Sequence, residues 1–115
     1  MSPINGYELL LPQGVLDYFE VVGVKDSAKE IILHLEEKNT YQQERSDILV
    51  ESKGFLPEVL VNDFPVRGRS LLLNIRRRRW INKNTGEYLQ RDLRLIAQGT
   101  RLTAEFAAFL KGIHR

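Results

Sequence analysis

The chain has 115 residues, of which 43% are hydrophobic, so it fits a single domain over residues 1–115 with its own core and is not expected to be disordered. It contains no cysteine, which excludes disulfides, thiolate metal sites and cysteine nucleophiles. The net charge is only +2, yet residues 1–63 carry five Lys/Arg against twelve Asp/Glu, whereas residues 64–94 carry nine against two. This polarisation favours a polyanionic partner for one surface.

The N-terminus is not expected to be a targeting or membrane segment. It has no basic stretch, and its only apolar run is Leu9-Leu10-Leu11, which is far too short to span a bilayer. The lack of cysteine also fits a reducing compartment. We therefore expect a soluble cytoplasmic protein without a membrane partner.

The acidic first part, residues 1–37, is predicted to form a short helix followed by a β-hairpin. Pro12 suits a first helical position and apolar residues follow at helical spacing, which predicts a helix near residues 12–19. Residues 20–24 and 30–37 have strand-like alternation on either side of a turn. The second strand is expected to direct three apolar residues to the core: Ile31, Leu33 and Leu35.

The segment 38–47 is polar and without period, and it is expected to be a loop. Strand character returns after it, with a break at Gly54 and a predicted strand at residues 58–62. Residues 65–68, Pro-Val-Arg-Gly, have the composition of a turn. The strands and the turn after this loop belong to the basic part of the domain, residues 48–95.

The centre of the basic part is a second predicted hairpin. Its strands, residues 70–82 and 87–95, flank a turn that ends at Gly86. If Gly86 takes the left-handed position of a three-residue loop, Ile81 faces Leu89 across the hairpin.

This register divides the basic hairpin into an apolar face and a wet, basic face. The apolar face contains Leu71, Leu73, Ile75, Ile81, Leu89, Leu93 and Leu95. The basic face contains Arg76, Arg78, Trp80, Asn82, Tyr88, Gln90, Asp92 and Arg94. Alternation directs Arg77 and Arg79 to the apolar face, so either they lie beyond its edge or the strand bulges there.

An amphipathic helix is predicted over residues 102–113, with Thr103 as the cap of its first turn. Its apolar stripe consists of Phe106, Phe109, Leu110 and Ile113. The stripe must pack on the sheet, on another copy of the chain or on a segment outside it. Together the elements predict an α+β fold, an antiparallel sheet of β-hairpins with a short N-terminal helix and a C-terminal amphipathic helix.

The sequence offers little for catalysis. Only two histidines are present, His34 and His114, eighty residues apart, so neither a zinc site nor a catalytic pair can be assigned. The carboxylates of the first half are interpreted as a solvated face. We therefore expect a protein that is not an enzyme and has no metal ion and no cofactor.

The basic hairpin instead predicts a nucleic-acid contact, because arginine forks match phosphate oxygens and a two-stranded ribbon can enter a major groove. The predicted phosphate contacts are Arg67, Arg69, Arg76, Arg78, Lys83, Arg91 and Arg94. Trp80 is predicted to wedge between bases or to stack on one, as Tyr88 could. The alternative is that the arginines balance the acidic half of the same molecule, with Trp80 in the core.

The run VNDFPVRGRSLLLNIRRRRWINKNTGEYLQRD, followed by GTRLTAEFAAFLK, resembles the N-terminal region of insertion-sequence transposases of the ISAon type. In the wider group, a strand that ends in arginines and an aromatic leads into a Cys-x-x-Cys-Gly knuckle, a second strand and a helix that opens with Arg-x-Thr. Residues 76–80 match the first element, Gly86 matches the knuckle glycine, and residues 101–103 match the helix entry. Asn82 and Thr85 occupy the positions of the two cysteines, so the resemblance implies a zinc-ribbon-like hairpin that is stable without zinc.

The resemblance implies a DNA-binding N-terminal region of a transposase that recognises the terminal DNA of its element. It does not imply strand transfer by this chain, which would belong to a separately encoded catalytic subunit. The competing hypothesis is a protein–protein interaction module. In that case the stripe of the C-terminal helix docks the catalytic subunit or a second copy of the chain, which would give a homo-oligomer.

Overall fold

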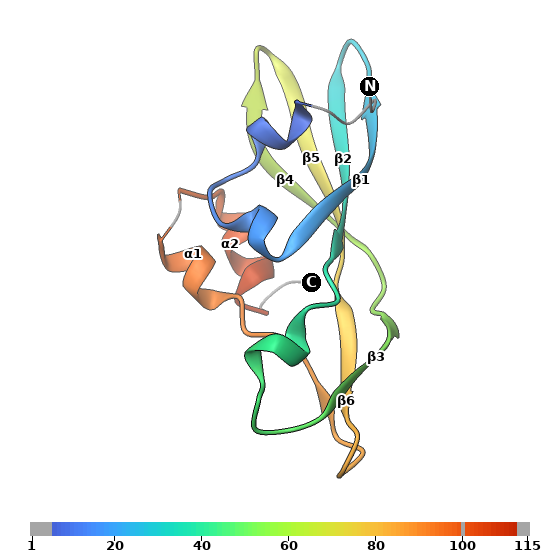
Figure 1. Cartoon of the computed structure of the whole chain (residues 1–115). Coiled ribbons are helices and arrows are strands. Elements are labelled where there is room, and N and C mark those ends of the chain that lie inside the picture. The colour runs from blue at the N-terminus through green and yellow to red at the C-terminus, as the bar shows by residue number, and fades with distance from the viewer. Residues whose placement is uncertain (1–5, 100, 113–115) are drawn as a thin grey trace.

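The computed structural model describes residues 6–99 and 101–112 and shows an α+β fold. Two β-sheets, antiparallel except for one strand pairing, are accompanied by short helices (Figure 1). This confirms the predicted fold class. The molecule is elongated, with extents of 49 × 32 × 23 Å, and the two sheets follow one another along its length.

The larger sheet has the strand order β1-β2-β5-β4. It consists of β1 (Phe19–Asp26), β2 (Glu30–Glu37), β4 (Val59–Val66) and β5 (Arg69–Arg76). The pairs β1-β2 and β4-β5 are antiparallel hairpins, whereas β2 and β5 pair in parallel. The parallel pairing is not among the sequence predictions, and it joins the acidic and basic parts of the chain in one sheet.

One face of the larger sheet carries the core, because side chains along β2 and β5 alternate between buried and partly exposed positions. Ile31, Leu33 and Leu35 are each at most 1% exposed, which confirms the predicted core face of that strand. The matching positions of β5 are also buried: Leu71, Leu73 and Ile75. The helices lie on this side of the sheet (Figure 1).

Two α-helices follow the sheets in the sequence, α1 (Arg94–Gly99) and α2 (Ala104–Leu110). The second confirms the predicted C-terminal helix and its cap, because the Thr103 hydroxyl accepts a hydrogen bond from the Phe106 amide at 3.1 Å. Its stripe residues Phe106, Phe109 and Leu110 are at most 2% exposed and belong to the core cluster, while Ile113 lies outside the described residues. The stripe therefore packs on the sheet of its own chain.

The short helix predicted near residues 12–19 forms only as a 3₁₀ turn and not as an α-helix. Only 3₁₀ turns form in this region, η1 (Tyr7–Leu10) and η2 (Val15–Asp17). Gly14 precedes the second turn with φ 93°, a left-handed conformation that cannot be part of an α-helix, and β1 already begins at Phe19.

The predicted strand over residues 87–95 is wrong beyond its first residues. Only β7 (Tyr88–Leu89) is extended, and α1 begins at Arg94. The Asp92 carboxylate accepts a hydrogen bond from the Arg94 amide at 3.0 Å, which satisfies a free donor at the start of that helix. Nowhere in the two described ranges is a helix long and apolar enough to cross a membrane.

The smaller sheet has the order β3-β6-β7 and consists of β3 (Val50–Phe55), β6 (Arg78–Asn82) and β7. The predicted strand 70–82 is thus interrupted at Arg77, where the chain leaves the larger sheet and enters the smaller one. The predicted loop 38–47 contains a 3₁₀ turn, η3 (Tyr41–Glu44), whose tyrosine is 7% exposed.

The predicted hairpin register is wrong by one residue. Trp80 pairs with Leu89, and Ile81 pairs with Tyr88. Gly86 has the predicted left-handed conformation, with φ 78°, but the Asn82 amide donates to the Glu87 carbonyl at 2.8 Å, so the loop has four residues and not three. Because cross-strand partners share a face, Trp80 lies on the side of Leu89, and Ile81 lies on the exposed side of Tyr88.

Candidate nucleic-acid interface

A buried carboxylate lies at the junction of the two sheets. Glu37, the last residue of β2, is 0% exposed. One of its oxygens accepts from Arg77 Nε at 3.4 Å and from the Arg78 amide at 3.0 Å, and the other accepts from Arg91 Nη1 at 3.4 Å. Burial raises the pKa of Glu37, while the nearby guanidinium groups act in the opposite direction.

Arg91, a predicted phosphate contact, is not accessible to DNA. It is 2% exposed and donates to Glu37, to the Thr40 hydroxyl at 2.8 Å and to the Glu44 carboxylate at 3.0 Å. Its guanidinium carbon also lies 5.0 to 5.6 Å from the ring centroids of three aromatic residues: Tyr18, Tyr41 and Trp80. The prediction for Arg91 is wrong because its charge is already compensated inside the protein.

Trp80 is also buried, so the predicted wedge or stacking role is wrong. Its side chain is 1% exposed, its ring centroid lies 4.9 Å from that of Tyr41, and its indole N–H is 3.5 Å from the Asn39 side-chain oxygen. The interruption at Arg77 shifts the alternation of β6 by one residue, and this directs Trp80 inward. For this residue, the alternative of a core tryptophan is confirmed.

The four consecutive arginines divide between the interior and the surface. Arg77 is 7% exposed and also donates to the Arg91 carbonyl. Arg78 donates to the Glu37 carbonyl at 2.7 Å and to the Ser52 hydroxyl at 3.0 Å, so it connects β6 to β2 and β3. Its predicted phosphate contact would have to displace these bonds. Neither alternative given for Arg77 describes it: the strand is interrupted at this residue, and its side chain is buried.

Three other predicted contacts are paired on the surface. Arg69 bonds Asp26 and the Ser27 carbonyl, Arg76 bonds Glu36 at 2.9 Å, and Arg94 bonds Asp92 at 2.8 Å. Their side chains are 32%, 42% and 66% exposed. The hydrogen bonds from Arg94 lower the pKa of Asp92 to about 2. Surface pairs of this kind add little stability, so these guanidinium groups remain able to exchange partners.

The remaining predicted contacts, Arg67 and Lys83, are exposed. Arg67 lies in the β4-β5 turn with φ 49°, and Lys83 lies in the β6-β7 turn. These two turns are at opposite ends of the elongated molecule (Figure 1). A single small contact surface therefore cannot include both.

Beside Lys83, the structure brings together two residues that are absent from the predicted contacts. Arg79 is exposed, and its guanidinium carbon lies 4.8 Å from the ring centroid of Tyr88, which is 61% exposed. Lys53 lies on the neighbouring β3, half exposed and paired with Glu51 at 3.2 Å. Tyr88 and Glu51 pair with Ile81 from its two sides and so share its outward face, and Arg79 lies two residues away on the same strand. We call the set Lys53, Arg79, Lys83 and Tyr88 the hairpin face.

The turn of this hairpin is held by side-chain oxygens at the positions where the resembled family has cysteines. The Asn82 side chain accepts from the Asn84 amide at 2.9 Å, and the Thr85 hydroxyl accepts from the Glu87 amide at 3.2 Å. Such local bonds favour tight turns. Within residues 6–99 and 101–112, no three His, Asp or Glu side chains gather into a group that could hold a metal ion.

No protein-family model matches the chain, and neither a curated protein nor a solved structure does. The transposase origin therefore remains an expectation from the sequence resemblance.

Proposed function

We propose that the chain is a DNA-binding module without catalytic activity, the N-terminal part of a transposase of the kind that it resembles. It contacts the DNA of its element through the hairpin face. The observation that best supports this proposal is the exposed Tyr88 ring, with Arg79 over it and Lys83 exposed in the adjoining turn, on a hairpin that extends away from the helices (Figure 1).

This arrangement suits a nucleic acid because it offers two kinds of contact at once. The guanidinium and ammonium groups can neutralise phosphates, and an exposed aromatic ring can stack on a base or pack on a sugar. The Arg79–Tyr88 stacking holds both side chains on the outer side of the sheet, where a phosphate backbone can reach them.

Strand transfer would then be the task of a separately encoded catalytic subunit, and both would act in the cytoplasm. The interaction-module hypothesis requires an exposed stripe on the C-terminal helix. Phe106, Phe109 and Leu110 of this stripe instead cover the sheet of their own chain. These buried residues are therefore not available to dock the catalytic subunit or a second copy of the chain.

The salt dependence of DNA affinity tests the proposal. The hairpin face offers about three phosphate contacts, so the logarithm of the association constant should fall with the logarithm of salt concentration at a slope of about −3. Fluorescence anisotropy of a labelled duplex, titrated with the full chain at several salt concentrations, measures this slope. A slope near zero, or no binding at low salt, would contradict the proposal.

A further inference from the structure

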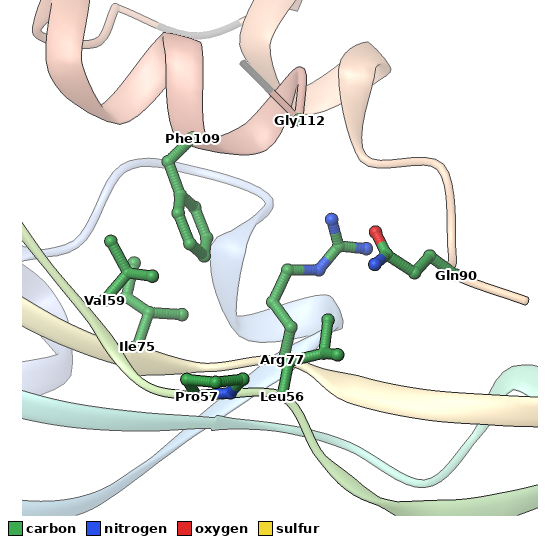
Figure 2. A pocket seen from close by; sticks show the side chains of 8 residues that line it. All are labelled: Leu56, Pro57, Val59, Ile75, Arg77, Gln90, Phe109 and Gly112. Atoms are coloured by element: carbon green, nitrogen blue, oxygen red, sulfur yellow. The ribbon is translucent and has the colours of Figure 1, made fainter. Parts of the chain in front are cut away.

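A hollow of about 300 Å³ lies between the larger sheet, α2 and the segment that follows β7 (Figure 2). One side is apolar and consists of Leu56, Pro57, Val59, Ile75 and Phe109. The other side consists of the polar side chains of Arg77 and Gln90, together with Gly112. A mostly apolar lining with a few converging polar groups is typical of small-ligand sites. The volume of this hollow is at the lower end of the range for such sites.

The guanidinium group of Arg77 lines this hollow. Its side chain is 8% exposed, its Nε donates to Glu37, and its Nη2 donates to the Arg91 carbonyl. Within the described residues, Nη1 has no hydrogen-bond acceptor. Figure 2 shows the guanidinium group and the Gln90 carboxamide facing one another at the rim. An acceptor placed in the hollow would therefore gain a charge-assisted hydrogen bond from this group.

The surroundings are positively charged. A second hollow, of about 330 Å³, shares Arg77 and Gln90 with the first and adds Arg94 and Lys111 to its rim. Asp92 also lines it and neutralises Arg94, because both oxygens of this carboxylate bond the Arg94 side chain, at 2.8 to 3.3 Å, so Lys111 supplies the remaining positive charge at the rim. The field at Arg77 Nη1 therefore favours an anion over a neutral acceptor.

We propose that this hollow binds a small carboxylic acid with an apolar body. The carboxylate accepts from Arg77 Nη1 and from the Gln90 amide, and the apolar body packs against Phe109, Val59 and Ile75. A bare inorganic anion would leave the apolar wall unused, and a neutral apolar molecule would leave the guanidinium donor unpaired. The site lies apart from the hairpin face, so this proposal does not rest on DNA binding.

Titration of the full chain with phenylacetate, followed by ¹H–¹⁵N NMR, tests the site. We expect saturable shifts at the Gln90 side-chain amide and at the Phe109 backbone amide. Two comparison ligands separate the contribution of the carboxylate from that of the apolar ring. 2-Phenylethanol lacks the carboxylate, and acetate lacks the phenyl ring. Each should bind at least about tenfold more weakly, because each loses either a charge-assisted hydrogen bond or the apolar contact. Equal affinity for phenylacetate and either comparison ligand would overturn the proposal.

Two substitutions locate the binding. Gln90→Leu removes a donor from an exposed side chain and should weaken phenylacetate binding severalfold without changing the fold. Val59→Phe fills the apolar end and should abolish binding. The control Lys53→Gln, on the smaller sheet, should bind like the wild type. Unchanged binding in Gln90→Leu, or the absence of saturable shifts in the wild type, would count against the site even if Val59→Phe fails to fold.

Discussion

Replacing Arg91 by methionine is expected to lower the free energy of unfolding by about 3–5 kcal/mol, because it removes one of the two guanidinium groups paired with the buried Glu37 carboxylate together with its bonds to Thr40 and Glu44. Arg91 is 2% exposed and bonds Glu37 at 3.4 Å and Glu44 at 3.0 Å. Methionine keeps much of the apolar stem but can neither pair with Glu37 nor donate to Thr40. Urea unfolding monitored by circular dichroism measures the loss.

The matched control is Arg94→Met, three residues later in the sequence. Arg94 is 66% exposed and pairs only with Asp92 among the ion pairs of the described residues. The same substitution should change the free energy of unfolding by no more than about 0.5 kcal/mol there. Similar losses for the two variants would mean that the buried network around Glu37 does not hold the sheets together.

Replacing Trp80 by alanine is expected to lower the free energy of unfolding by about 3–5 kcal/mol, the usual cost of truncating a large buried aromatic residue. The indole is 1% exposed, packs on Tyr41 and lies 5.2 Å from the Arg91 guanidinium carbon. Its loss therefore opens a cavity and removes one wall of the Arg91 site. Guanidinium unfolding monitored by far-ultraviolet circular dichroism measures the change.

Tyr88→Ala is the control for Trp80→Ala, because both residues lie in the same small hairpin. Tyr88 is 61% exposed, so its truncation should change stability by no more than about 0.5 kcal/mol. A large loss for Tyr88→Ala together with a small one for Trp80→Ala would reverse the assignment of the inner and outer faces of the hairpin.

The regular parts of the fold follow from local sequence. Alternation on β2 and β5 identifies the core face, and the stripe of α2 with its Thr103 cap identifies the helix. These signals depend only on neighbouring residues. The parallel pairing of β2 with β5 depends on segments forty residues apart, and no local pattern encodes it.

The wrong predictions of side-chain direction concern the region where the chain passes from the larger sheet to the smaller one. Alternation from Leu73 to Arg77 places a charged side chain on the core face, which conflicts with its polarity. Glu37 resolves the conflict by accepting from Arg77 in the interior, and the strand then changes phase before Trp80. Because Glu37 precedes Arg77 by forty positions, the sequence does not reveal which arginines its charge neutralises.

The candidate interface could be predicted only in part. Lys83 and the basic character of the hairpin are visible in the sequence, and Lys83 is exposed as expected. Arg91 and Trp80 are buried because interior partners satisfy them, and Arg79 faces outward because of the phase change. A count of arginines cannot separate these cases.

DNA binding by the hairpin face is tested most directly by the DNA affinity of the double variant Arg79→Gln/Lys83→Gln. Compared with the wild type, we expect an unchanged melting temperature, weaker duplex binding, and a salt slope closer to zero by about 2, since two phosphate contacts are lost. The matched double variant Arg67→Gln/Arg69→Gln, at the opposite end of the molecule, should keep the wild-type slope. Wild-type affinity and slope in Arg79→Gln/Lys83→Gln would contradict the claim that the hairpin face binds DNA.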